Sequence, residues 1–396
     1  MGVTAATLHQ QACAAIDAAT GNLIALSRAI HAAPEPAWQE HATARRLVEF
    51  LRALPGATVE EHTADLPTAF RAWAGTADGP TVGVIAEYDA LPGLGHACGH
   101  NLIAAAAAGA LVGVAAVADR LPGRVMVIGS PAEEGGGGKI AMARRGAYDG
   151  LAAVLQVHPA DRHRLSGPTI GLAVLAVEFR GRAAHAGSAP ERGVNALDAV
   201  VQLFTALNAM RQQVPDGCRL YGIITRGGET LHTVPDHTAA QVGVRAPTLA
   251  LLDGLAARVE DCARAAALAT GCTVTVERPP LSQYPPMRLN RTLGCLLADA
   301  MRSLGEEVED FPPGPEGYAN DAAVVSRLAP AALLNFGIGP RGLAEHSAAF
   351  AAAAASEAGH RGMLQAAKAM AIAAVELITD PALRRRVREE FERGDA

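Results

Sequence analysis

Three short apolar runs in this chain each end in polar side chains that can carry chemistry. The runs cover residues 81–86, 124–130 and 151–157, and their continuous apolar character predicts strands buried on both faces of a sheet. The polar residues that follow them are Glu87 and Asp89, Glu133 and Glu134, and His158. Because open α/β folds build their sites at the carboxyl ends of strands, the repetition predicts that these side chains gather at one edge.

The segment His96-Ala-Cys98-Gly-His100-Asn adds a thiol and two imidazoles directly after the Glu87 and Asp89 pair. Thiolate, imidazole and carboxylate together suit zinc, manganese or iron better than magnesium or calcium, which prefer oxygen ligands. The alternative is a buried cysteine that meets a surface pair of histidines by chance. The density of candidate ligands disfavours that alternative.

The adjacent residues Glu133 and Glu134 follow a buried strand and precede four glycines. Successive side chains on an extended segment point in opposite directions, so one carboxylate can bind metal while the other faces a water molecule. We expect Glu133 to act as general base and Glu134 as ligand. With His346 further along the chain, the inventory fits a co-catalytic site whose two metals lie roughly 3.5–4 Å apart. A solvated loop pair is the alternative interpretation of the two glutamates.

The pattern changes after residue 172, where strands and helices follow in the order β-α-β-β-α-β that is typical of a ferredoxin-like unit. A chain of 396 residues also exceeds the usual size of one hydrophobic core. We therefore expect an α/β protein with a discontinuous catalytic domain, residues 1–172 and 285–396, built on a central mixed sheet flanked by helices. An inserted α+β lid or dimerisation domain would occupy residues 173–284.

The composition excludes several partners and locations. A formal net charge of −6 gives no reason to expect nucleic acid or an anionic membrane. The richest apolar run, residues 102–117, is too short to span a bilayer. The six cysteines are scattered without a C-x-x-C pair, and no secretory signal is evident, which favours reduced thiols in a cytoplasmic protein. The histidines outside any motif are expected at the surface: His9, His41, His62, His163 and His360.

Three motifs together resemble the aminoacylase/carboxypeptidase G family of co-catalytic metallohydrolases. They are Glu-Tyr-Asp-Ala-Leu-Pro with His-Ala-Cys-Gly-His-Asn (87–101), Pro-Ala-Glu-Glu-Gly-Gly-Gly-Gly-Lys (131–139) and Gly-Arg-Ala-Ala-His-Ala-Gly (181–187). The resemblance is closest to the amidohydrolase branch, with its aminobenzoyl-glutamate hydrolases, auxin-conjugate hydrolases and cytosolic dipeptidases. Asn101 is similar to the aminobenzoyl-glutamate and dipeptidase-like group, because auxin-conjugate hydrolases usually carry Asp there. The resemblance implies two divalent metal ions per subunit, zinc or manganese, held by Cys98, His100, Glu134, His158 and His346, with Glu133 as the catalytic carboxylate.

The same resemblance places His185 in the small domain, where in relatives it reaches the active site of the other subunit and stabilises the oxyanion. It therefore implies a homodimer formed through residues 173–284. Arg245 is a candidate clamp for a substrate carboxylate, with a surface ion pair as an equal alternative. His232 stands where relatives usually have Asn, so we group it with Asn195 as a candidate substrate-binding residue. Glu87, Asp89 and Asp321 are expected around the metal ligands; for Asp321, a helix cap is an open alternative.

These residues predict metal-dependent hydrolysis of the amide bond of small N-acyl amino acids or related amides, by a water molecule that Glu133 activates. A dipeptidase acting on small dipeptides is the first alternative. A catalytically silent, metal-dependent binding protein is the second, and the retention of both glutamates and every implied ligand argues against it. A phosphate-binding loop at residues 135–139 is excluded, because the segment lacks the spacing and the Ser or Thr of a P-loop.

Overall fold

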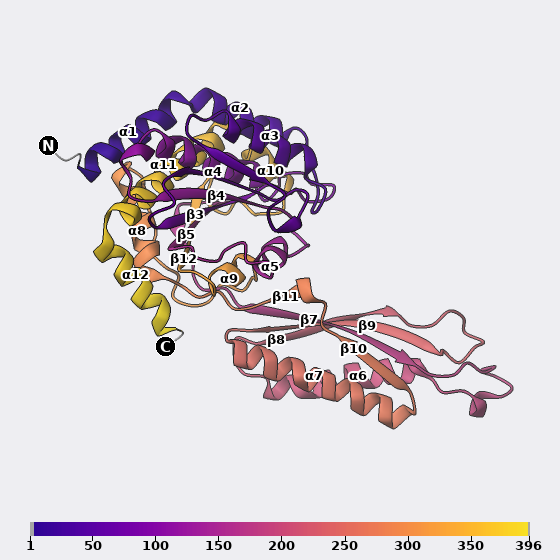
Figure 1. Ribbon diagram of the computed structural model, residues 1–396. Helices are drawn as coiled ribbons and strands as arrows, with labels where there is room; N and C mark the ends of the chain where they lie inside the picture. Colours follow the sequence, from indigo (N-terminus) through magenta and orange to yellow (C-terminus); the bar gives the residue numbers. More distant parts are fainter. Residues whose placement is uncertain (1–3, 395–396) are drawn as a thin grey trace. The chain divides into compact units, whose positions relative to one another are not determined.

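The computed structural model describes residues 4–394, which divide into two compact units (Figure 1). Over that span, the first unit takes in segments 1–168, 288–314 and 321–396. The second unit takes in residues 169–287 together with 315–320. The sequence pattern gives no sign that the short segment 315–320 groups with the second unit. Each unit is described by itself below.

The first unit is built on a mixed sheet with the strand order β1-β2-β4-β3-β5-β12-β6. The four strands β4, β3, β5 and β12 run parallel to their neighbours within this set, and the remaining pairs are antiparallel. The predicted buried strands correspond to β3, β4 and β5, so the predicted α/β class is confirmed. The strands are β1 (Thr58–Glu61), β2 (Phe70–Gly75), β3 (Thr81–Glu87), β4 (Arg124–Ser130), β5 (Ala153–Ala160), β6 (Arg164–Leu165) and β12 (Ala331–Gly337).

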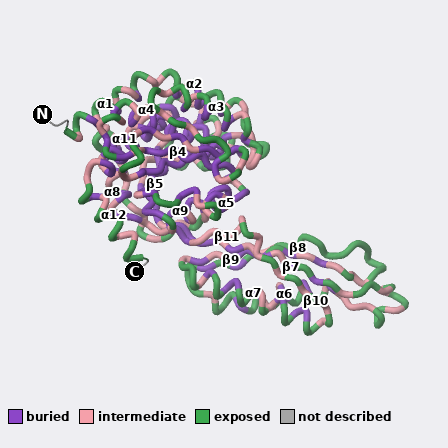
Figure 2. Tube along the Cα trace, viewed as in Figure 1, coloured by how far each residue is buried: buried purple, intermediate pink, exposed green. Residues whose placement is uncertain are grey.

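Helices cover both faces of this sheet because its central strands are apolar on both sides. In β3, Val82 and Val84 belong to a core shared with α4 and α11, whereas Ile85 belongs to a second core shared with α5 and α9. The buried trace along β4 and β5 is visible in Figure 2. The helices are α1 (Ala5–Ala18), α2 (Thr20–His31), α3 (His41–Arg52), α4 (His100–Ala115), α5 (Gly138–Ala143), α8 (Arg291–Ser303), α9 (Ala322–Val325), α10 (Ala348–Ala353), α11 (Glu357–Thr379) and α12 (Pro381–Arg393).

The helix α4 packs closely against its neighbours because its buried surface is made of small residues. A Cβ atom added at Gly109 would lie 2.9 Å from the side chain of Ala367 on α11. The helix α11 is long and apolar enough to cross a membrane by length and composition alone, but 72% of that stretch is buried inside the structure. Its apolar character is therefore explained by its place as a core helix.

The second unit is an antiparallel sheet in the order β10-β7-β9-β8, with β11 paired to β7, and α6 and α7 packed on one face. The order of its elements along the chain confirms the predicted ferredoxin-like arrangement. Strand β8 is an edge strand that exposes Tyr221, Ile223 and Ile224. The elements are β7 (Gly171–Arg180), α6 (Ala196–Met210), β8 (Arg219–Arg226), β9 (His237–Ala246), α7 (Leu249–Thr270), β10 (Thr273–Glu277) and β11 (Gln283–Tyr284). Short 3-10 turns in the two units cover Thr63–Asp65, Ala118–Arg120, Pro190–Arg192, Arg211–Gln213 and Pro280–Ser282.

Candidate metal centre

The loops after β3, β4 and β5 meet at one edge of the sheet of the first unit. These strands are parallel neighbours, and Glu87 at the end of β3 lies in register with Ser130 at the end of β4. The segment that follows β3 turns into α4 through Gly99, whose backbone is left-handed (φ 75°). A Cβ atom there would lie 2.7 Å from Pro159. This close approach brings Cys98 and His100, on either side of Gly99, next to the end of β5.

Three groups of side chains in this region can each hold a cation, since their ligand atoms lie within 4.8 Å of one another. All five ligands that the sequence motifs imply occur in these groups, together with Glu133. Cys98 belongs to two of the groups. The groups are Cys98 with His100 and His158, Cys98 with Glu134 and His346, and His100 with Glu133 and Glu134.

Two imidazoles are oriented by hydrogen bonds at their outer nitrogens. His100 Nδ1 lies 2.9 Å from the backbone oxygen of Asp89 and 3.1 Å from its carboxylate. His158 Nδ1 lies 2.8 Å from the backbone oxygen of Pro159. Both rings therefore donate from Nδ1 and turn Nε2 inward, and His158 Nε2 lies 3.4 Å from Cys98 Sγ. This is the arrangement by which proteins orient metal-binding histidines.

The donor set fits a divalent metal ion. His100 Nε2 lies 3.7 Å from a carboxylate oxygen of Glu133 and 3.9 Å from oxygens of Glu134 and Glu87. Three of these buried atoms have no hydrogen-bond partner among residues 4–394: His100 Nε2, Glu134 Oε1 and Glu87 Oε2. Buried polar atoms without a partner are costly, and a bound cation would satisfy the two ligand atoms directly. Thiol, imidazole and carboxylate donors are those that zinc and manganese accept.

His346 reaches this cluster from a strained stretch of backbone. Its φ of 59° lies in the left-handed region, which is uncommon for a side chain of this size. The backbone nitrogen of His346 donates to the oxygen of Ala97 at 2.9 Å, which ties the loop to the segment before Cys98. Its Nε2 lies 3.5 Å from Glu134 Oε2. Strain of this kind persists where the surrounding structure imposes it, often at functional sites.

A buried ion-pair network lies beside the ligands. Lys139 Nζ lies 2.5 Å from both Glu87 and Asp321, and the three side chains are inaccessible to solvent. Gln156 also donates to Glu87, at 2.7 Å. Burial alone would raise the pKa of Glu87, but the Lys139 ammonium and nearby histidines bring that pKa below its ordinary value. The sequence motifs assign no role to Lys139; its one visible signal is a lysine in an apolar stretch directly after the glycine run.

Asp321 and Glu133 both depend on this network. Asp321 precedes α9, but its carboxylate makes no cap bond there and instead binds the side chain and the backbone nitrogen of Lys139. Of the two interpretations left open for Asp321, the helix cap is therefore wrong. Burial, together with the carboxylates of Glu87 and Asp321, raises the pKa of Glu133 well above its ordinary value. A carboxylate with a raised pKa is a stronger base.

His96 does not join the cluster, although it opens the cysteine–histidine motif. It is buried, and its ring centroid lies 6.0 Å from that of His31. Burial and the neighbouring His100 lower the pKa of His96 to about 3, so its imidazole is neutral. It occurs in none of the three cation-holding groups found over the described chain.

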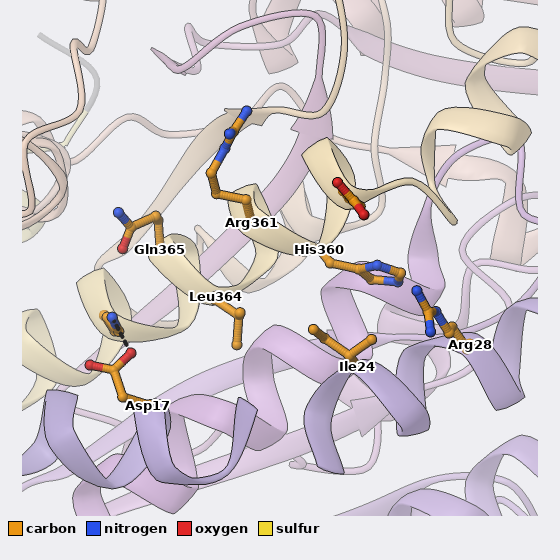
Figure 3. A pocket seen from close by; sticks show the side chains of 9 residues that line it. Asp17, Ile24, Arg28, His360, Arg361, Leu364 and Gln365 are labelled. Atoms are coloured by element: carbon orange, nitrogen blue, oxygen red, sulfur yellow. Dashed lines mark ion pairs between the residues drawn. The ribbon is translucent and has the colours of Figure 1, made fainter. Parts of the chain in front are cut away.

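His360 is not a surface residue, as its lack of a motif suggested, because it is only 2% exposed. It lies on α11 at a hollow of about 430 Å³ that is also lined by Ile24 and Arg28 of α2. Figure 3 shows its ring beside Arg28. Burial and the Arg28 charge lower the pKa of His360. The lining of this hollow includes none of the candidate metal ligands.

The remaining predicted site residues lie in the second unit, and their roles stay predictions. His185 Nδ1 accepts hydrogen bonds from the backbone nitrogens of Gly187 and Ser188, at 3.2 and 3.1 Å. The proton of the neutral ring therefore sits on Nε2. His232 is its neighbour, since the His232 carbonyl accepts the Ala186 nitrogen at 2.9 Å.

Arg245 and Asn195 are placed differently. Arg245 lies on β9, where its Nε donates to the Tyr221 hydroxyl at 2.9 Å. Its Nη1 is buried and finds no partner among the residues that the structure describes. Asn195 caps α6, since its Oδ1 accepts the Leu197 nitrogen at 3.0 Å. The fold thus already uses the side-chain oxygen of Asn195.

Comparisons with known proteins agree with this geometry. The family model described as peptidase family M20/M25/M40 matches residues 83–369. The Xaa-Arg dipeptidase of Mus musculus is 40% identical over 97% of this chain and 92% of its own length. One of the polypeptides that form the p-aminobenzoyl-glutamate hydrolase of Escherichia coli K12 is 32% identical, over 69% of this chain and 60% of its own.

Among solved structures, a dinuclear metal-binding peptidase of the M20 family from Bacillus subtilis aligns with a TM-score of 0.70. It is 20% identical and covers 91% of this chain and 99% of its own, so it shows the fold. The resemblance that the motifs carry is confirmed by the family match and by the relatives. The chain therefore belongs to peptidase family M20/M25/M40 and is a metal-dependent hydrolase.

Proposed function

We propose that this enzyme hydrolyses the amide bond of small N-acyl amino acids, with Glu133 as the general base. The observation that carries the proposal is the convergence of six side chains from distant segments of the first unit: Cys98, His100, Glu133, Glu134, His158 and His346. Amide hydrolysis needs a polarised carbonyl, an activated water and a proton carrier, and this cluster offers groups for each.

The cluster would hold two ions, zinc or manganese. Cys98, His100 and His158 form one candidate ligand group, and Cys98 is shared with a second group that contains Glu134 and His346. A thiolate common to both groups supports two neighbouring cation positions. When bound, the ions would polarise the substrate carbonyl and lower the pKa of a water molecule toward neutrality. The histidines present Nε2 to these positions because their Nδ1 atoms are already hydrogen-bonded.

Glu133 carries the proton through the reaction. Its carboxylate takes a proton from the water as the water oxygen bonds to the acyl carbon. The same proton then passes to the amide nitrogen as the carbon–nitrogen bond breaks, so the products are a carboxylic acid and an amine. The raised pKa of Glu133 suits both transfers, because the group must first accept and then release the proton.

The second unit would supply an oxyanion donor and dimer contacts. His185 is exposed and carries its neutral-ring proton on Nε2, where it can donate to the developing oxyanion of a substrate bound by the partner subunit. The exposed apolar residues of edge strand β8 support pairing of two copies. Arg245 would clamp the substrate carboxylate, for which its buried and unsatisfied Nη1 is support. Sedimentation that shows a fully active monomer would contradict the dimer.

A dipeptidase is the second candidate, favoured by the 40% identity to a relative named Xaa-Arg dipeptidase. The chemistry at Glu133 would be unchanged, since a dipeptide also presents one amide and a terminal carboxylate. What would differ is recognition of a free amino group and of a basic side chain.

The test is a substrate panel with metal analysis. The panel contains N-acetyl, N-aroyl and β-alanyl amino acids and dipeptides that end in arginine, assayed by release of amine. We expect metal-dependent hydrolysis of at least one class, and a fall of about 10²–10⁴-fold in kcat for Glu133→Gln with unchanged metal content. Glu345→Gln, an exposed glutamate beside His346, is the control. Equal rates for wild type and Glu133→Gln would show that Glu133 is not the base.

A further inference from the structure

The carboxylate of Glu40 binds the turn that carries Glu133 and Glu134. Its Oε1 accepts the backbone nitrogen of Ala132 at 2.9 Å and that of Trp38 at 2.8 Å. Its Oε2 accepts the hydroxyl of Thr68 at 3.1 Å. Glu40 is fully buried, so an acidic side chain from the N-terminal segment sits inside the protein directly behind the candidate catalytic turn.

Ala132 holds a backbone conformation that its side chain disfavours. Its φ of 56° lies in the left-handed region, where glycine is at ease and alanine is not. The oxygen of Ala132 accepts the nitrogens of Gly136 and Gly138, both at 3.2 Å, and thereby closes the turn. The direction in which the chain leaves Ala132 sets the starting direction of Glu133 and Glu134.

The same N-terminal segment touches the metal-site loops at two further points. A Cβ atom on Gly136 would lie 2.2 Å from Trp38 Nε1, so the indole packs directly on the turn. The oxygen of Glu35 accepts the backbone nitrogen of Ala90, next to Asp89, at 2.8 Å. Residues 35–40 therefore contact both the loop after β3 and the loop after β4.

Folding alone does not explain a carboxylate at this position. Burial raises the pKa of Glu40 to about 7, which means that its charged form is disfavoured inside the protein. A glycine at position 132 would relieve the backbone strain without any buried acid. The combination of a strained alanine and a buried carboxylate that holds its nitrogen points instead to control over the geometry of the turn.

We propose that Glu40 is a positioning residue for hydrolysis, which holds Ala132 in its left-handed conformation and thereby aims Glu133 and Glu134 at the metal centre. This inference rests on the proposed role of Glu133 as general base. Glu40 itself contacts neither Glu133 nor any candidate metal ligand through its carboxylate; its polar contacts are Ala132, Trp38 and Thr68.

The first test compares Glu40→Gln with a matched control, Glu35→Gln. Glu35 lies on the same segment and also accepts two backbone nitrogens and one threonine hydroxyl, from Ala42 and Thr43, at 2.7–3.0 Å. At a pH of about 8, we expect Glu40→Gln to lower kcat by about 10–100-fold with KM within about twofold, as small misplacements of catalytic groups do. Glu35→Gln should keep kcat within about twofold. A wild-type kcat in Glu40→Gln overturns the proposal.

The second test is rescue by glycine. If Glu40 acts by holding Ala132 in a strained conformation, Ala132→Gly removes the need for it. The double variant Glu40→Gln/Ala132→Gly should recover kcat to within about threefold of wild type. A double variant no faster than Glu40→Gln overturns the proposal, since a purely structural role of Glu40 would not be rescued at Ala132. Should Glu40→Gln fail to fold, Glu40→Asp with and without Ala132→Gly carries the same comparison.

The third test does not depend on activity. Hydrogen exchange of the peptide covering residues 131–139, in the full metal-loaded protein, should be faster in Glu40→Gln than in wild type and unchanged in Glu35→Gln. Unchanged exchange in Glu40→Gln overturns the inference. Faster exchange in that variant, combined with a wild type that hydrolyses nothing in the panel, supports the holding of the turn by Glu40 and counts against the proposed function alone.

Discussion

Asp89 holds His100 and the Glu134 turn in one arrangement. Its Oδ1 lies 3.1 Å from His100 Nδ1, and its Oδ2 accepts the backbone nitrogen of Glu134 at 2.9 Å. Burial alone would raise the pKa of Asp89, but the hydrogen bond and charge of His100 bring that pKa below its ordinary value. Both oxygens of this carboxylate are therefore committed to donors.

Replacement of Asp89 by Asn is expected to weaken metal binding. An amide has only one oxygen, so its NH₂ group would face either the His100 ring proton or the Glu134 nitrogen, and one donor would lose its acceptor. We expect Asp89→Asn to lower metal affinity by about 10–100-fold, as measured by competition with a chelator. Asp119→Asn, an exposed acid, is the control. Unchanged affinity in Asp89→Asn would contradict an orienting role.

The chain contains two lysines, Lys139 and Lys368, which allow a matched comparison of a buried and a surface ion pair. Lys139→Met would leave the buried carboxylates of Glu87 and Asp321 without their cation, and should cost about 3–5 kcal/mol of unfolding free energy. Lys368→Met breaks a pair with the exposed Asp17 and should cost about 1 kcal/mol or less. Denaturant unfolding measures both.

Addition of Asp321→Asn to Lys139→Met should cost less than the sum of the two single changes, because the two groups share one network. Additive losses in this double-mutant cycle would mean that the 2.5 Å contact contributes nothing specific.

The buried carboxyl of Glu40 predicts a pH dependence of stability. Its pKa is about 7 in the folded protein, against 4.5 as the ordinary value. The folded state therefore binds more protons between these values, and its stability falls as pH rises through this window. The stability of Glu40→Gln relative to wild type should increase by up to about 3 kcal/mol between acidic pH and a pH of about 8. Parallel unfolding curves across that range would show that the pKa is not raised.

Metal removal should lower the unfolding temperature, because ions that bind only the folded protein stabilise it by mass action. Saturation at about 100 times the dissociation constant corresponds to about 2.7 kcal/mol per site. In Cys98→Ala, which loses the ligand shared by two groups, chelation should have little effect. Cys295→Ala, at an exposed cysteine outside the groups, should respond to chelation as wild type does. A wild type whose melting curve ignores the chelator would exclude structural coupling of the ions.

The sequence was sufficient to predict the residues that follow buried strands. Glu87, the Glu133 and Glu134 pair, and His158 each come directly after a continuous apolar run, and parallel strands bring such positions to one edge. The insertion of a ferredoxin-like unit also followed from the order of strands and helices. Both inferences depend on local pattern together with a general rule of sheet geometry.

The residues that the sequence did not reveal are charges whose partners are distant in the chain. Lys139 pairs with Asp321, and Glu40 accepts the nitrogen of Ala132. Neither pairing leaves a periodic signal, because an isolated lysine or glutamate usually lies at the surface. His360 was misplaced for the same reason: whether a lone histidine on a helix is buried depends on which neighbour packs there.

The position of His346 has a consequence for the order in which the protein is made. Glu134 and His346 occupy one ligand group, yet the whole second unit and strand β12 are synthesised between them. A nascent chain that has not yet released residue 346 from the ribosome lacks a ligand and cannot complete the centre. Hydrolytic capacity thus arises in one step, late in translation, rather than growing with the length of the emerging polypeptide.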